Sequence, residues 1–154
     1  AELPDAERAI AAELGADDVC LLRSVDDGAA FEAVSQRRWL GYGTRMRASN
    51  YGTMRNVLAT GDAVHVLDGD AGADGGELAL LRRAQAATML LAPVVSGGRP
   101  LGVLLLFRAT DQRWSRAEVS RARIVGFAMA PLLDPAAAPQ LAAVPDAAGG
   151  TLLP

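Results

Sequence analysis

The sequence contains two apolar runs, residues 88–95 and 101–108, separated only by Ser-Gly-Gly-Arg-Pro. A connection of this length and composition is typical of a hairpin, so the two runs are predicted to pair as antiparallel strands. Leucine and valine fill successive positions of both runs rather than alternate ones, so both faces of the sheet are apolar and need cover. We therefore expect an α+β fold in which a sheet lies between two layers of helices.

Shorter patterns predict further elements around this hairpin. Pro4 suits the first turn of a helix and Gly15 suits a helix C-terminus, so residues 4–14 are predicted to be helical. Apolar runs bounded by turn residues predict strands, and amphipathic spacing predicts helices. The expected strands are residues 19–22, 30–35 and 64–67, and the expected helices are residues 43–60, as one helix or two short pieces, and residues 77–85. The acidic, glycine-rich segment 68–76 is expected to be a flexible loop.

Ser115 and Glu118 have the spacing of a capping box, which predicts that a final helix starts there. Pro131 and Pro135 should kink or end this helix, because proline lacks the backbone donor and clashes with the preceding turn. Beyond Asp134 the chain is rich in Ala, Pro and Gly, a composition typical of linkers. The predicted division is a folded domain over residues 1–133 and a linker or tail over residues 134–154.

Charge and cysteine content argue against several classes of protein. The net charge is −3, and the 15 basic residues are all arginines scattered along the chain, so the sequence offers no continuous basic track to a nucleic acid. A single cysteine, Cys20, excludes an internal disulfide and fits a reducing cytoplasm. No apolar run is long enough to span a membrane. We expect no nucleic-acid binding and no membrane segment.

The order of the predicted elements and several phrases resemble the GAF domain, a sensory module of bacterial signalling proteins. The phrases are IAAELGADDVCLL at residues 10–22, VLATGDAVHVLD at residues 57–68, and the last hairpin with its closing helix at residues 90–133. This resemblance implies a PAS-related antiparallel sheet of five to six strands, with the first and last helices on one face and the central helices on the other. It also implies a pocket between the sheet and the central helices, and pairing of the terminal helices with another subunit.

The residues that we expect at such a pocket could provide apolar walls and a few polar groups. They are Tyr51, Met54, His65, Leu81 and Met89, with Trp39 and Arg45 as second-rank candidates at its mouth. An alternative of at least equal weight is that Tyr51, Met54, Leu81 and Met89 belong to an ordinary core. His65 itself is either a ligand-orienting group, with haem ligation as a specific possibility, or a strand histidine with a backbone or solvent partner.

The sequence contains no recognisable catalytic phrase and no metal cluster, so we expect neither catalysis nor a bound cofactor. The absence of lysine departs from the signature of cyclic-nucleotide GAF domains. Two hypotheses remain. The first is a non-catalytic sensor of an unidentified small-molecule effector, a homodimer through residues 4–14 and 116–133, attached to an output domain in a longer signal-transduction or transcription-regulating protein. The second is a ligand-free dimerisation or scaffolding module of the same fold, which a filled interior would favour.

Overall fold

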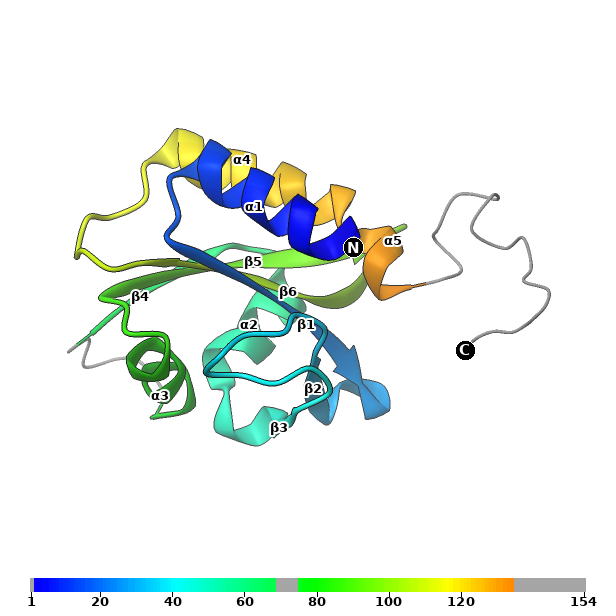
Figure 1. Cartoon of the computed structure of the whole chain (residues 1–154). Helices are drawn as coiled ribbons and strands as arrows, with labels where there is room; N and C mark the ends of the chain where they lie inside the picture. Colours follow the sequence, from blue (N-terminus) through cyan, green and yellow to red (C-terminus); the bar gives the residue numbers. More distant parts are fainter. Residues whose placement is uncertain (1, 69–74, 135–154) are drawn as a thin grey trace.

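The computed structural model describes residues 2–68 and 75–134 of the chain. It contains a six-stranded antiparallel sheet with the strand order β3-β2-β1-β6-β5-β4, and helices cover both faces of this sheet (Figure 1). The strands are β1 (Asp18–Val25), β2 (Ala30–Ala33), β3 (Arg45–Arg47), β4 (Val64–Leu67), β5 (Thr88–Ser96) and β6 (Arg99–Arg108). The helices are α1 (Glu2–Leu14), α2 (Gly52–Thr60), α3 (Gly75–Arg83), α4 (Arg116–Ala128) and α5 (Ala130–Leu133), with the 3-10 turns η1 (Asp26–Gly28) and η2 (Ala48–Asn50). The predicted fold class is confirmed.

The hairpin of β5 and β6 forms the centre of the sheet, as the two apolar runs predicted. Ser96 pairs with Arg99, so the turn between the strands consists of Gly97 and Gly98 alone. Both glycines have positive φ angles, 58° and 77°, a conformation that matches the twist of a two-residue hairpin and that glycine adopts without strain. The connection is therefore shorter than the five-residue loop expected from the sequence.

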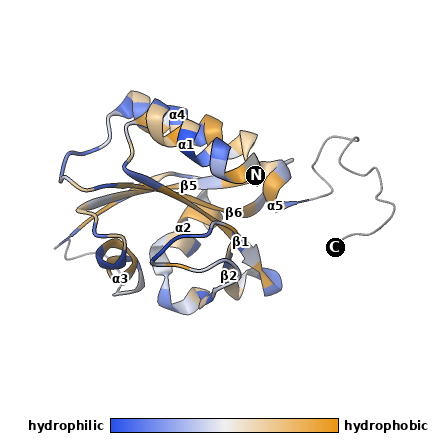
Figure 2. Cartoon of the chain, viewed as in Figure 1, coloured by the Kyte–Doolittle hydropathy of each residue, from blue (hydrophilic) through white to orange (hydrophobic). Residues whose placement is uncertain are grey.

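Successive residues of β6 face opposite layers of helices. Leu104 and Leu106 belong to a buried cluster with residues of α1, α4 and α5, whereas Leu105 and Phe107 belong to a second cluster with residues of α2 and α3. Apolar residues line the strands between the two layers, and polar residues lie on the outer surfaces of the helices (Figure 2). The expectation that both faces of the sheet are covered is confirmed.

The outer layer of α1 and α4 approaches the sheet closely. The two helices lie side by side on one face (Figure 1). At Gly126 of α4 a Cβ atom would lie only 2.3 Å from the carbonyl oxygen of Pro93 in β5. A side chain cannot fit at this distance, so glycine allows the backbones of helix and strand to meet.

The prediction of a helix from residue 43 was wrong over its first part. Residues 45–47 form the edge strand β3, in which Met46 pairs with Phe31 of β2. Met46 is buried between the exposed Arg45 and Arg47, which is the alternation of a strand with one covered face. A strand of three residues is too short for this period to stand out in the sequence. The helix itself starts at Gly52.

The closing helix has the predicted start and the predicted break. The Ser115 hydroxyl accepts a hydrogen bond from the Glu118 N–H, and the Glu118 carboxylate accepts one from the Ser115 N–H, which completes the capping box. Helix α4 ends at Ala128, and Pro131 lies in the first turn of the separate short helix α5. Pro135, the tail and most of the acidic loop, residues 69–74, lie outside the described residues. No helix of the described part is both long and apolar enough to cross a membrane.

Candidate functional site

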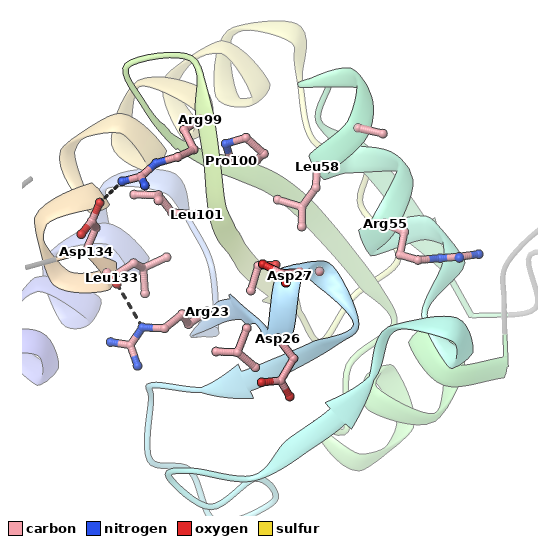
Figure 3. Close-up of a pocket in the computed structure, with 14 residues that line it drawn as sticks. Arg23, Asp26, Asp27, Arg55, Leu58, Arg99, Pro100, Leu101, Leu133 and Asp134 are labelled. Carbon is pink, nitrogen blue, oxygen red and sulfur yellow. Dashed lines mark hydrogen bonds and ion pairs between the residues drawn. The ribbon is translucent and has the colours of Figure 1, made fainter. Parts of the chain in front are cut away.

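A cavity of about 640 Å³ lies at one end of the sheet (Figure 3). Four segments that are distant in the sequence form its walls: the end of β1 with the turn η1, the C-terminal half of α2, the start of β6, and the end of α5 with Asp134. Small-molecule sites in proteins have volumes in this range. The cavity is therefore a candidate functional site of the described residues.

Apolar side chains from each segment line part of this cavity. They are Val25 of β1, Leu58 of α2, Leu101 of β6 and Leu133 of α5. Leu133 is buried, and its Cδ1 atom would lie 2.6 Å from a Cβ at Gly102. The absence of a side chain at Gly102 thus lets α5 pack against β6 and complete the cavity wall.

Two arginines of the lining fasten α5 in place. The Arg23 Nε donates a hydrogen bond of 3.0 Å to the backbone oxygen of Leu133, and its Nη2 lies 3.4 Å from the oxygen of Leu132. Arg99 forms an ion pair with Asp134, the residue that follows α5. Cations suit the C-terminal carbonyl groups of a helix, which have no partner within it. The cavity therefore shares residues with the anchoring of the last described helix.

The turn η1 at the cavity rim has an unusual backbone. Asp26 and Asp27 have φ angles of 55° and 54°, and Gly28 follows with 88°, so three residues in succession are left-handed. This conformation is uncommon for residues other than glycine and costs of order 1 kcal/mol for each of them. Asp26 is paired with Arg45 at 2.9 Å. Within residues 2–68 and 75–134, Asp27 has no hydrogen-bond or ion-pair partner for its carboxylate, which points into the cavity in Figure 3.

The structure brings together three of the predicted pocket residues. Met54, Leu81 and Met89 belong to one cluster between the sheet and the helices α2 and α3, and all three are 0% exposed. Their own side chains fill the space that they share, and none of them lines the cavity described above. Their part in ligand binding stays a prediction.

Tyr51 and Trp39 pack at the margin of the same cluster. Tyr51 precedes α2 and lies against α3, because a Cβ at Gly76 would be 2.8 Å from its ring; burial raises the pKa of its hydroxyl. The Trp39 ring contacts Phe107 edge-on, with 5.2 Å between the ring centroids. Arg45 lies outside the cluster, exposed on β3, where it holds Asp26.

His65 lies on the opposite face of the sheet from the three methionine and leucine residues. It pairs with Leu90, which belongs to the cluster under α1 and α4, whereas the next residue of β4, Val66, belongs to the cluster under α2 and α3. Its Nε2 atom is buried without a hydrogen-bond partner in the described part of the chain. Burial, together with the nearby charge of Arg113, lowers the pKa of the imidazole despite a hydrogen bond to the backbone of Trp114.

The remaining chemical groups of interest are the cysteine and the potential metal ligands of the described residues. Cys20 is buried as a free thiol, and burial raises its pKa to about 12, so it is protonated and unreactive at neutral pH. In the part of the chain that the structure describes, no group of three or more His, Cys, Asp and Glu side chains could hold a metal ion.

Comparison with known proteins identifies the family. The GAF domain family model matches residues 6–130, so the chain belongs to the GAF domain family, the sensory and regulatory domains of signalling proteins. GAF domains are typically non-catalytic regulatory modules. A search of curated proteins finds no match.

Solved structures show the same fold at low sequence identity. The GAF domain of a two-component sensor histidine kinase from Bacillus halodurans is 15% identical, with a TM-score of 0.68 over 87% of this chain and 95% of that one. A GAF domain/HD domain protein from Geobacter sulfurreducens is 15% identical, with a TM-score of 0.67 over 85% and 89%. The blue-light absorbing form of the Thermosynechococcus elongatus PixJ GAF domain is 20% identical, with a TM-score of 0.63 over 88% of both chains.

The residues of the cavity at the end of the sheet were not among those predicted from the sequence. The signal that was available is the run Val25-Asp26-Asp27-Gly28, which reads as a turn after a strand. The other walls come from segments more than 25 residues away in the sequence, and only the closed fold brings them to the same place.

Proposed function

We propose that this GAF domain is a non-catalytic sensor of a small molecule, and that it regulates an output domain in a longer signal-transduction or transcription-regulating protein. The observation that carries this proposal is the cavity of about 640 Å³, because its wall includes α5, the last described helix before the remainder of the chain. A ligand in this cavity touches the element through which a response can leave the domain.

The relatives support the regulatory part of this proposal. Two of the solved GAF domains come from proteins whose names include a histidine kinase and an HD domain. We infer a comparable arrangement here, in which the GAF domain changes the activity of a separate output domain.

Native mass spectrometry of the 154-residue chain, produced in its source organism, tests the sensor proposal. We expect a mass above that of the chain under native conditions and the chain mass alone after denaturation. A protein that carries nothing, and that no fraction of a metabolite extract stabilises against thermal unfolding, would rule out small-molecule sensing.

The second candidate function is that of a ligand-free dimerisation module. Two observations support it. The interior between the sheet and the central helices is filled by fully buried side chains such as Met54, Leu81 and Met89. In addition, Ile124 and Phe127 of α4 are 67% and 58% exposed, although large apolar residues seldom face solvent on a helix. Light scattering distinguishes this candidate: it requires a dimer whose mass and stability do not respond to any added compound.

A further inference from the structure

In the described part of the chain, some charged side chains around the cavity have partners of opposite charge and others do not. This difference indicates which kind of ligand the cavity binds. The inference rests on the proposed sensor function. The arginines of the lining that face the cavity are already engaged. Arg23 pairs with Glu32 at 3.2 Å and with the carbonyl groups of α5, and Arg99 pairs with Asp134. Arg55 extends away from the cavity in Figure 3.

Of the three acidic residues of the lining, two have an ion-pair partner and one has none among the described residues. Asp26 is paired with Arg45, and Asp134 is paired with Arg99. Asp27 points its carboxylate into the cavity without a partner in the described part of the chain (Figure 3). An occupant that fills the cavity removes water from this carboxylate, and a buried carboxylate needs a partner of opposite charge or a hydrogen-bond donor.

Two further features of the walls favour a cation. The C-terminal half of α2 forms one wall, so the negative end of this helix lies on the cavity side. Much of the remaining surface is apolar, with contributions from Val25, Leu58, Leu101 and Leu133. A divalent metal does not fit this description, because it needs several oxygen ligands and only one carboxylate here is uncompensated.

We propose that the cavity is the effector site of this domain and that it takes a small organic cation, an amine or quaternary ammonium compound with an apolar body. The ammonium group pairs with Asp27, and the apolar body packs between Leu58 of α2 and Leu133 of α5. A ligand that contacts both helices stabilises the docked position of α5, which Arg23 and Arg99 hold in its absence. The left-handed backbone conformation of Asp26 and Asp27 is strained, and it directs the Asp27 carboxylate into the cavity.

Three matched compounds test the charge of the ligand: 2-phenylethylamine, 2-phenylethanol and phenylacetate, each titrated into the 154-residue chain and followed by two-dimensional amide NMR. We expect the amine to shift the signals of Leu58, Leu101 and Leu133, and Asp27→Asn to weaken its binding by about tenfold or more, as for the loss of a charged hydrogen bond. Asparagine tolerates the left-handed backbone, so this variant keeps the turn. Asp111→Asn, an exposed residue outside the lining with the same change of net charge, should leave the affinity unchanged.

The outcomes separate this inference from the sensor function. If phenylacetate or phenylethanol shifts the cavity signals as strongly as the amine, the cavity is an effector site but not one for cations. If none of the three compounds shifts these signals, the assignment of the cavity is overturned, whereas a retained ligand in native mass spectrometry would still establish sensing. If Asp27→Asn and Asp111→Asn weaken the binding of the amine equally, the effect comes from the net charge of the protein, and the role of Asp27 is overturned.

Discussion

His65 is the single histidine of the chain, which makes its titration a clean probe of the face beneath α4. Its pKa in the folded state is lowered from the ordinary value of 6.5, first by burial and then by Arg113. The unfolded chain therefore binds a proton more readily than the folded chain, and the free energy of unfolding falls as the pH drops below 6.5.

We expect His65→Gln to remove this part of the pH dependence. Urea unfolding of the parent chain should give a lower stability at about pH 5.5 than at about pH 7.5, before most carboxylates begin to titrate. The variant should show a smaller difference between the two conditions. An undiminished difference would mean that His65 is solvated in the folded state.

Ser115 allows a second test at the level of one side chain. Its hydroxyl accepts a hydrogen bond of 3.1 Å from the Glu118 N–H, so Ser115→Ala should lower the free energy of unfolding by about 1 kcal/mol. Ser120→Ala, on the exposed face of the same helix, loses no cap and serves as the control. Equal denaturation midpoints for the two variants would show that the cap adds nothing.

The capping box also makes stability depend on acid. The hydrogen bond from the Ser115 N–H, followed by that from Arg108, lowers the pKa of Glu118 below its ordinary value of 4.5. A lowered carboxylate pKa contributes stability above the unfolded value, and this contribution is lost as the pH falls through the folded value. Glu118→Gln removes the titrating group and should therefore unfold with less sensitivity to pH below about 4.5, as measured by urea unfolding across that range.

At the scale of the elements, the contact between α4 and β5 depends on Gly126. A methyl group there would lie 2.3 Å from the Pro93 carbonyl oxygen, so Gly126→Ala should push the helix from the sheet and cost roughly 1–3 kcal/mol. The gain in helix propensity offsets part of this loss. Gly75→Ala, at the start of α3, adds the same methyl where no atom lies within 4 Å and should be near neutral. Thermal unfolding monitored by circular dichroism compares the two variants.

Elements with a local signal could be predicted from the sequence, and those defined by a distant partner could not. Two long apolar runs rich in leucine and valine predict the central strands, and the capping box predicts the start of α4. The strand β3 has three residues, and Met46 is recognisable as inward-facing only once Phe31 lies opposite to it. Pairing of this kind is set by the packed sheet rather than by local preference.

The candidate site was harder to predict for the same reason. Met54 and Met89 lie on the expected face, but whether a space between sheet and helix is filled or open depends on the volumes of all its neighbours. His65 was expected at the same pocket, yet the register of β4 against β5 turns it to the other face. The cavity residues Asp27 and Leu133 are separated by the length of the domain, and no spacing in the sequence relates them.

For the whole molecule, the exposed apolar face of α4 predicts self-association. Ile124 and Phe127 lie one turn apart and are the most exposed large apolar residues of the described helices. We expect light scattering to give twice the chain mass of 16.0 kDa at tens of micromolar, since burial of both side chains on a second copy removes them from water.

Phe127→Glu should return the protein to the mass of one chain. Tyr42→Glu is the matched control, because Tyr42 is 71% exposed but lies in the segment between β2 and β3, on no helix. This variant should keep the mass of the parent. A parent protein of single-chain mass would contradict the interface, and dissociation by both substitutions would contradict its position on α4.

The break between α4 and α5 limits which helix movements can be transmitted at the C-terminal end of the domain. A helix transmits a rotation along its axis only where it is continuous. Here α4 ends at Ala128 and α5 begins at Ala130. We therefore expect a rotation of α4 not to pass rigidly into α5, because the two helices can change their angle at Met129. Two contacts restrain α5: the Arg23 guanidinium donates to the carbonyl groups of Leu132 and Leu133, and Arg99 pairs with Asp134. If the proposed sensor function holds, substitutions of Arg23 or Arg99 should therefore change the strength of the response while α4 itself stays unaltered.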